Sequence, residues 1–170
     1  ERLWAAQTDL TRSLDELPAH WQYIDQLYQL LQPLDGGLAL LDVGCGIHSF
    51  ARLLLLNLSY RLRAQTWNQN QPLRYIGIDF SVAALHAAQD ATSDALKHVD
   101  RLFSGRISGP TPVSQQWVLG RSVETLPFAD HSFDRIVANL SLSFSRSPLH
   151  ALRELFRVLR PGGKLIVSAI

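Results

Sequence analysis

The sequence has little of several features that commonly hold a small fold together or anchor it to a membrane. Its 170 residues include one cysteine, Cys45, and no methionine. A single cysteine excludes an internal disulfide framework and a cysteine-based zinc cluster, and we expect no metal site. No apolar run approaches the ~18 residues that cross a bilayer, since the leucines of 53–56 form only a short stretch. The chain begins at Glu1, so we expect the native protein to start earlier, and a targeting segment could already have been removed.

An excess of charge of either sign is also missing. Sixteen Lys and Arg face fifteen Asp and Glu, which gives a net charge of +1. This balance indicates neither a nucleic-acid binder nor a membrane-surface protein. With 46% hydrophobic and 18% charged residues, the composition is that of a compact globular domain.

Short apolar runs alternate with helical patterns along most of the chain. Apolar residues at steps of three and four predict helices, and short continuously apolar runs predict strands buried on both faces of a parallel sheet. Strands alternating with helices give an α/β fold with a doubly wound sheet and right-handed crossovers. The expected helices are 3–17, 21–31, 82–97 capped by Ser81, and 148–160 capped by Ser147, and the expected strands are 38–43, 75–78, 117–119, 133–138 and 164–167.

Two segments are longer than the usual connections of such a fold. Residues 61–74 are polar and rich in Gln and Asn, and residues 100–116 carry glycines, prolines and serines. We interpret both as surface insertions. Each is either a tolerated insertion without a role or a border of a substrate site.

A glycine turn and an aspartate carry the chemical signal. The first strand runs into Gly44-Cys45-Gly46, and a helix follows whose free N–H groups suit a carboxylate or phosphate. Asp79 ends the second strand, where neighbouring carboxyl ends meet at the switch point, and it could accept both hydroxyls of a ribose. The alternatives are a short packing turn for the glycines and a helix-capping role for Asp79. Ser49 stands where the dinucleotide fingerprint has a third glycine or alanine.

Together with further motifs in order, this turn resembles the class I S-adenosylmethionine-dependent methyltransferases. The matching stretches cover about four-fifths of the chain and are LDVGCG at 41–46, ETLPF at 124–128, DHSFD at 130–134, ALRE at 151–154 and RVLRPGGKL at 157–165. The resemblance implies a Rossmann-like, mostly parallel sheet of order 3-2-1-4-5. The family has seven strands, so we expect a chain that stops after the fifth to continue or to have its apolar edge covered by another chain.

The resemblance also implies roles for individual residues in binding S-adenosyl-L-methionine. Gly44, Cys45 and Gly46 would let its methionine portion approach the backbone, and Asp42 would help hold the amino group. Asp79 would take the ribose hydroxyls, and Phe80 would lie beside the adenine. The remaining implied residues are Ser122 and Val123 near the adenine amino group and ring, and Asn139 and Leu140 at the methionine end facing the acceptor.

Two residues depart from the family pattern. His48 replaces a glycine or small residue and could point at the cofactor, at the acceptor or into solvent. Ser122 replaces the acid that binds the adenine amino group, and its neutral hydroxyl contributes less than a carboxylate would. His48, His131 and His150 are the candidates if the acceptor needs a base, although a solvated surface role is the simpler interpretation and no catalytic residue is assigned.

The motif around Asn139 is similar to that of methyltransferases acting on small molecules and acyl carriers. We expect a helical segment over 1–37, a cofactor-binding core over 38–170, a cytoplasmic location, and neither a nucleic-acid nor a membrane partner. The alternatives are a methyltransferase-like domain without turnover, an NAD-dependent oxidoreductase and an interaction scaffold without a ligand. The sequence does not identify the acceptor or the oligomeric state.

Overall fold

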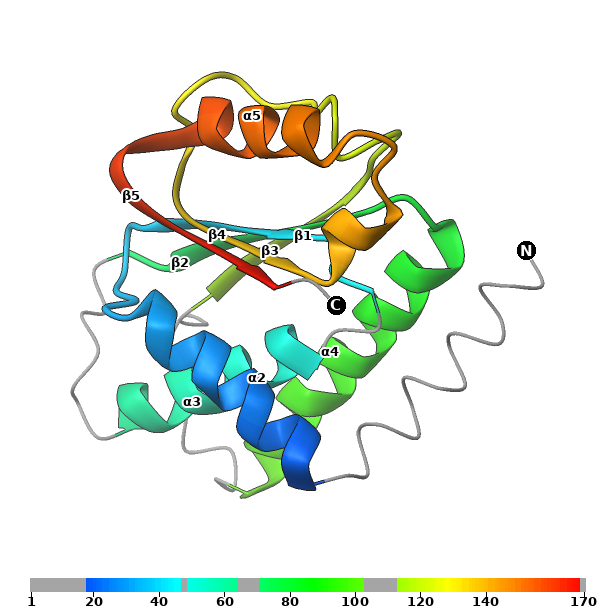
Figure 1. The fold of residues 1–170 in the computed structure, drawn as a ribbon. Helices are drawn as coiled ribbons and strands as arrows, with labels where there is room; N and C mark the ends of the chain where they lie inside the picture. The colour runs from blue at the N-terminus through cyan, green and yellow to red at the C-terminus, as the bar shows by residue number, and fades with distance from the viewer. Residues whose placement is uncertain (1–17, 47–48, 64–70, 103–112, 169–170) are drawn as a thin grey trace.

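The computed structural model describes residues 18–46, 49–63, 71–102 and 113–168. Strands and helices alternate along the chain, as the apolar pattern predicted (Figure 1). The helices are α2 (Pro18–Leu31), α3 (Ser49–Arg63), α4 (Val82–Leu102), the 3-10 helix η1 (Ser141–Phe144) and α5 (Pro148–Val158), and the strands are β1 (Ala39–Val43), β2 (Leu73–Asp79), β3 (Val113–Leu119), β4 (Phe133–Asn139) and β5 (Leu159–Ser168).

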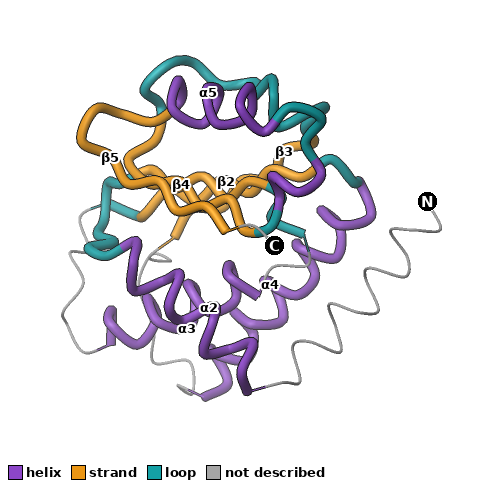
Figure 2. Tube along the Cα trace, in the orientation of Figure 1, coloured by secondary structure: helices purple, strands orange, loops and turns teal. Residues whose placement is uncertain are grey.

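The five strands form one parallel sheet in the order β3-β2-β1-β4-β5 (Figure 2), which confirms the expected order. Val43 of β1 pairs with Ile78 of β2, so the glycine turn and Asp79 leave the sheet side by side. On the other side of β1, Asp42 pairs with Val137 of β4. The register therefore brings the ends of β2, β1 and β4 together at one edge.

Helices cover both faces of this sheet, with α2, α3 and α4 on one face and α5 on the other (Figure 1). All five residues of β1 are buried, as expected for a central parallel strand. One apolar cluster joins α2 and α3 to β1 and β2, and a second lies between the sheet and α5. Ile24, Leu27 and Leu31 of α2 belong to the first cluster, so this helix is part of the main core.

The boundary between the last helix and the last strand was predicted incorrectly. Helix α5 ends at Val158, and Leu159 is already extended and pairs with Phe133 of β4. Arg160 therefore lies in β5, where it contacts both carboxylate oxygens of Asp134 at 2.8 Å, and it does not lie in the last turn of a helix. The sequence Pro161-Gly162-Gly163 falls in the irregularity between the two paired parts of β5, a position that tolerates proline.

The two predicted insertions are shorter than expected because regular elements extend into them. Helix α3 continues to Arg63, β2 begins at Leu73, α4 continues to Leu102 and β3 begins at Val113. The rest of each insertion, and the helix expected over 3–17, fall largely outside the described residues. At Ser147 the predicted cap is incomplete, since the residue occupies the N-cap position without a side-chain capping bond.

Strand β5 lies at the edge of the sheet and pairs only with β4 within the described part of the chain. Val167 on this strand is 37% exposed. None of the helices described is both long and apolar enough to span a membrane.

Candidate functional site at the carboxyl ends of the strands

Buried polar groups gather where β1, β2 and β4 end. Four polar or charged residues are buried in the described part of the chain, and three of them, Asp42, Asp79 and Ser141, lie at this edge. The fourth, Thr92, satisfies its hydroxyl within its own helix by donating to the Ala88 carbonyl at 2.8 Å. Buried polar groups are costly, so their concentration at one edge marks a candidate binding site.

The glycine turn is fastened to the end of β2. The backbone N–H groups of Gly44 and Cys45 donate to the Ile78 carbonyl at 2.8 and 3.1 Å. The next N–H, that of Gly46, donates to Oδ2 of Asp79 at 2.8 Å. The two motifs singled out in the sequence are therefore in direct contact.

Asp79 is 3% exposed, and each of its carboxylate oxygens accepts one backbone hydrogen bond. Oδ2 accepts from Gly46, and Oδ1 accepts from the Ser81 N–H at 2.9 Å. The helix-capping role falls to Ser81, as predicted, because its hydroxyl accepts from the Ala84 N–H at 3.3 Å. A carboxylate has about four acceptor positions, so among the described residues each oxygen keeps one, and the two could accept from a pair of vicinal hydroxyls.

The two glycines of the turn serve different purposes. Both have positive φ, +69° at Gly44 and +53° at Gly46. A Cβ on Gly44 would lie 2.5 Å from the Cβ of Ser141, so this glycine makes room for η1. Among the described residues, a Cβ on Gly46 would meet only the Gly44 carbonyl oxygen within 4 Å, at 3.8 Å. Gly46 is thus less crowded by described residues than Gly44.

Asp42 is held by a tyrosine from the neighbouring strand. The Tyr75 hydroxyl donates to Oδ2 of Asp42 at 2.7 Å, and both side chains are almost fully buried. Burial, opposed by the Tyr75 bond and reinforced by the charge of Asp79, raises the pKa of Asp42 to about 7. A cationic group at this edge would favour the ionised carboxylate.

Cys45 faces the interior of the protein. Its side chain is 6% exposed, and its Sγ lies 3.1 Å from where a Cβ on Gly77 would be. Burial, followed by the charges of Asp42 and Asp79, raises the pKa of this thiol. Any part of Cys45 in ligand binding therefore falls to its backbone.

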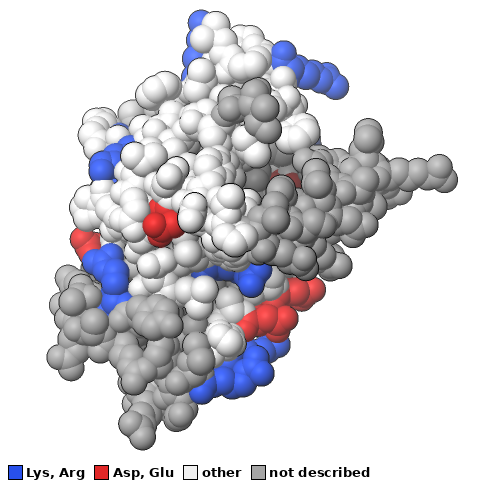
Figure 3. Space-filling model, turned by 60° about the horizontal axis from the view of Figure 1, so that its bottom comes forward, with Lys and Arg blue, Asp and Glu red and all other residues white. Residues whose placement is uncertain are grey.

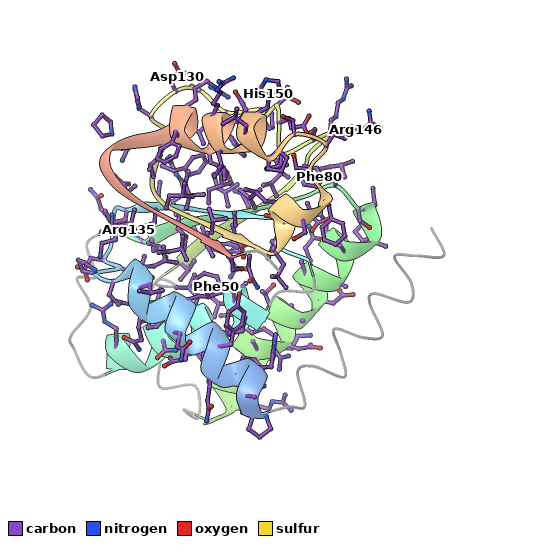
Figure 4. All side chains as sticks on the ribbon, in the orientation of Figure 1. Phe50, Phe80, Asp130, Arg135, Arg146 and His150 are labelled. Carbon is purple, nitrogen blue, oxygen red and sulfur yellow. The ribbon has the colours of Figure 1, made fainter. Side chains whose placement is uncertain are left out.

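The predicted adenine-side residues follow β2 and β3. Phe80 lies at this edge beside the start of α4 (Figure 4), and its ring closely approaches the Cα of Gly120, where an added Cβ would be 2.8 Å from Cε1. The Ser122 hydroxyl accepts from the Glu124 N–H at 3.0 Å, and Val123 is buried. Among the described residues, no hydrogen bond joins Ser122 or Val123 to the turn and Asp79.

Asn139 at the end of β4 is held by two hydroxyls. Its Oδ1 accepts from Tyr23 of α2 at 2.5 Å and from Ser168 of β5 at 2.6 Å. Ser168 Oγ in turn accepts from the Leu140 N–H at 3.1 Å, so its own proton is available for Asn139. Leu140 has left-handed backbone angles, φ 56° and ψ 0°.

Two of the three histidines considered as bases, His131 and His150, lie within the described residues. His131 precedes β4, at the opposite end of the strand from Asn139, and its Nδ1 lies 3.0 Å from the Leu159 carbonyl oxygen. His150 is exposed in the first turn of α5 (Figure 4). His48 lies outside the described residues.

The motifs between β3 and α5 form a structural cluster around Arg157. Its guanidinium donates to Glu154 and Asp130 and to the carbonyls of Leu126 and Phe128, at 2.7–3.1 Å. Glu154 also accepts from the Leu126 N–H at 3.0 Å. These residues hold the loop that carries Ser122 against α5.

Three residues of this edge were missed by sequence reasoning: Ser141, Tyr75 and Tyr23. Each gains its place only through tertiary packing, since Tyr75 looks like an ordinary strand residue and Tyr23 like a helix residue. Ser141 belongs to the motif around Asn139, which the sequence analysis noted without a role for this serine. The signal that identifies them is burial and hydrogen bonding in three dimensions.

Comparison with known proteins places this geometry in context. Residues 41–167 match the family model described as methyltransferase domain. The chain is 31% identical over 137 residues to the biotin biosynthesis bifunctional protein BioHC of Teredinibacter turnerae, covering 79% of this chain and 20% of that protein. It is 31% identical over 147 residues to the methyltransferase GfsG of Streptomyces halstedii, covering 86% of this chain and 42% of that protein.

Solved structures share the fold. The [4+2]-cyclase SpnF is 30% identical with a TM-score of 0.60, over 89% of this chain and 45% of SpnF. A protein of Methanococcus maripaludis has a TM-score of 0.64 at 21% identity, over 98% of this chain and 62% of its own, and this likeness concerns the fold alone. The chain spans less than half the length of BioHC, GfsG and SpnF.

Proposed function

Because the chain belongs to the methyltransferase domain family, which uses S-adenosylmethionine as methyl donor, we propose that it binds this cofactor where β1, β2 and β4 end and transfers the methyl group to an acceptor. One observation carries the proposal. The buried Asp79 carboxylate accepts from the Gly46 N–H, and among the described residues each of its oxygens keeps an acceptor position at the end of β2 beside the glycine turn. An aspartate so placed suits a ribose at the switch point of a parallel sheet.

The other residues fit the remaining parts of the cofactor. Phe80, packed against Gly120, is a flat apolar surface for the adenine, and Ser122 and Val123 follow Gly120 closely in the chain. Asp42, fixed by Tyr75, supplies negative charge for the amino group. The Oδ1 of Asn139 accepts two hydrogen bonds, and its amide nitrogen donates none within the described residues, so its N–H groups could donate toward the cofactor or the acceptor.

The bound cofactor supplies an electrophilic methyl group on a sulfonium sulfur. The residues of this chain orient the nucleoside and the amino-acid end so that an acceptor atom can approach in line. The placement of His131 at the opposite end of β4 argues against a role for it as a base. We therefore propose that positioning, more than proton transfer, is the contribution of this domain.

For the acceptor we propose a small molecule or a carrier-bound group. Relatives include the malonyl-[acyl-carrier protein] O-methyltransferase of Erwinia pyrifoliae and the ubiquinone/menaquinone biosynthesis C-methyltransferase UbiE of Roseobacter denitrificans. The net charge of +1 supports an acceptor other than a nucleic acid. On the face seen in Figure 3, Lys and Arg occur in separate groups with Asp and Glu between them.

The likeness to SpnF favours a second candidate. A protein 30% identical to this chain is described as a [4+2]-cyclase, so the fold also serves a protein named for a different reaction. The second candidate is a domain that keeps the cofactor site without methyl turnover. Binding and methyl transfer therefore have to be measured separately.

Isothermal titration of the full chain with S-adenosylmethionine, S-adenosylhomocysteine and NAD tests the cofactor. We expect the two sulfur nucleosides to bind and NAD not to bind. Asp79→Asn should weaken the binding of S-adenosylhomocysteine by about 2 kcal/mol, roughly thirtyfold. Asp90→Asn, on the exposed face of α4, should leave this affinity unchanged. Binding of NAD alone would overturn the proposal. Cofactor binding without transfer of labelled methyl to any of a panel of small and carrier-bound acceptors would favour the second candidate.

A further inference from the structure

Three side chains from distant parts of the chain meet at the end of β4. Oδ1 of Asn139 accepts from the Tyr23 hydroxyl of α2 at 2.5 Å and from the Ser168 hydroxyl of β5 at 2.6 Å. Tyr23 is 116 residues away from Asn139 in the sequence, and Ser168 is 29 residues away. A carbonyl oxygen has two lone pairs, so these two bonds occupy both of its acceptor positions. They also fix an amide whose terminal torsion is otherwise loosely restrained.

The distances indicate that the oxygen of the amide, and not its nitrogen, faces the two hydroxyls. Both distances are typical of O–H···O bonds and are shorter than the roughly 2.7–3.2 Å usual for N–H···O bonds. Ser168 Oγ already accepts from the Leu140 N–H at 3.1 Å, so its own proton is directed to Asn139. Asn139 therefore has only N–H donors left for a further partner, and within the described residues they donate to none.

The helix that carries Tyr23 is fastened to the rest of the fold at its other end. Cations of α3, β4 and β5 donate to carbonyls at and just after the C-terminal end of α2, namely Arg61 to Leu34, Arg135 to Leu31 and Pro33, and Lys164 to Gln32. Tyr23 lies about two helical turns before this end, roughly 12 Å along the axis. Its hydroxyl therefore reaches Asn139 from a helix that is held in place independently of that bond.

The fixed amide lies next to the proposed cofactor site. In the order β3-β2-β1-β4-β5, the nucleoside is assigned to the ends of β2 and β1, and Asn139 ends the next strand. Ser168, which binds the amide oxygen, belongs to β5 on the side away from β1. Since the oxygen and nitrogen of an amide lie on opposite sides of Cγ, the N–H groups are turned from β5 toward β1.

We propose that Tyr23 and Ser168 are positioning residues that leave Asn139 with donors only, and that this selects an acceptor with an anionic oxygen, a carboxylate or a phenolate, over an amine. The inference rests on the proposed function. The ionised oxygen forms its bond to the methyl carbon while the C–S bond breaks and its electron pair passes to sulfur, so the domain has no proton to remove.

The selectivity follows from the number of lone pairs on the acceptor atom. An anionic oxygen keeps lone pairs with which it accepts from the Asn139 amide while another attacks the methyl carbon. An amine has one lone pair, which the attack requires, and its N–H groups find no acceptor on Asn139 because both positions of Oδ1 are occupied.

Methyl transfer to matched acceptors tests this selectivity. The full chain is supplied with methyl-labelled S-adenosylmethionine and with pairs of acceptors on one carbon skeleton, a carboxylate or phenol and the corresponding amine, both free and as pantetheine thioesters. We expect the wild type to favour the oxygen acceptor by at least about tenfold in kcat/KM. Tyr23→Phe and Ser168→Ala, which let the amide turn, should each reduce this ratio about fivefold to tenfold.

Two further variants make the test specific. Tyr28→Phe is the matched control on the same helix, because the Tyr28 hydroxyl bonds none of the described residues, and it should keep the wild-type ratio. Asn139→Asp places an acceptor oxygen where the amide nitrogen was, so it should reverse the preference toward the amine. An unchanged ratio in Tyr23→Phe and Ser168→Ala, or a wild type that methylates the amine as fast as the oxygen acceptor, would overturn the inference.

Two readouts need no turnover. In NMR spectra of the nitrogen-labelled chain, the side-chain amide signals of Asn139, identified by their loss in Asn139→Asp, should shift in Tyr23→Phe and stay in place in Tyr28→Phe. In calorimetry, Tyr23→Phe should bind S-adenosylhomocysteine as the wild type does. Unmoved amide signals, or a weaker affinity that assigns the amide to the cofactor, would overturn the inference. A wild type that does not bind S-adenosylhomocysteine, or binds it and methylates neither class, would instead refute the proposed function.

Discussion

Gly44 and Gly46 share a positive φ, but only Gly44 lies against another element of the fold. We predict that Gly44→Ala lowers the free energy of unfolding by at least about 1 kcal/mol more than Gly46→Ala, because the new methyl group meets Ser141 as well as an unfavourable backbone region. Urea unfolding of both variants measures the difference. Ser141→Gly in the Gly44→Ala background should recover part of the loss, and equal losses for the two single variants would contradict this account.

Asp42 makes stability depend on pH. The pKa of the Asp42 carboxyl is raised to about 7 in the folded protein. Above about pH 5 the folded protein therefore still holds a proton that the unfolded chain has released. The free energy of unfolding thus falls as the pH rises toward 7 and then levels off. We predict that the difference in unfolding free energy between wild type and Asp42→Asn changes by about 2 kcal/mol between pH 5 and pH 7.5, with the variant gaining. Denaturant unfolding at several pH values checks this, and parallel pH profiles would refute it.

At the residue scale, the sequence predicted groups whose position follows from strand order. Asp79 and Gly46 are in contact because parallel strands end at a common edge, and that follows from the pattern of apolar runs. Ser141 could not be predicted, because its burial against Gly44 arises from tertiary packing in a segment that follows a left-handed Leu140. No local signal in the sequence distinguishes Ser141 from Ser143.

Among the elements, α5 is tied to the preceding loop through Arg157. Its guanidinium lies against two carboxylates and two carbonyls, and its hydrogen bonds to Glu154 lower the pKa of that carboxyl against the opposing effect of partial burial. We predict that Arg157→Ala lowers the free energy of unfolding by about 2 kcal/mol or more, since several charge-assisted bonds and two carbonyls lose their donor. Arg153→Ala, on the exposed side of the same helix, should cost less than about 0.5 kcal/mol. Equal effects in thermal or urea unfolding would show that the cluster around Arg157 is not structural.

The motifs at 124–128, 130–134, 151–154 and 157–165 thus contribute residues that hold the loop before β4 against α5. Sequence comparison identified these stretches, but it could not separate residues that contact a ligand from residues that hold a loop. Helix α5 itself was predicted well because its apolar stripe and Pro148 are local signals. Its end was misplaced because pairing of Leu159 with β4, a contact distant in sequence, ends the helix before the proline and glycines do.

For the whole molecule, ligand binding and stability are linked. A ligand that binds only the folded chain stabilises it by about 2.7 kcal/mol at one hundred times its Kd. We predict that S-adenosylhomocysteine at that excess raises the Tm by roughly 5–10 °C for a protein of this size, and that NAD at the same concentration does not. Differential scanning fluorimetry measures both shifts. A rise with NAD alone would favour the oxidoreductase alternative.

The architecture as a whole followed from the sequence because apolar runs, glycine turns and helical stripes agree with one another. The doubly wound sheet covered by helices could be predicted on that basis, and the strand order was implied by the resemblance to the family. The extent of the two insertions could not, because the polar residues at their ends continue regular elements: Arg61 bonds the Leu34 carbonyl at 2.6 Å and Asp35 at 2.8 Å from within α3. Contacts between residues distant in sequence produce no periodic pattern of residue types from which they could be predicted.

A crystal structure of the full chain with S-adenosylhomocysteine gives the most direct measurement. The quantities to read are the distances from the two ribose hydroxyls to the carboxylate oxygens of Asp79. We predict both within about 3.2 Å, with the backbone bonds from Gly46 and Ser81 retained. A nucleoside bound elsewhere, or a ribose turned away from Asp79 while the glycine turn stays as it is, would contradict the account.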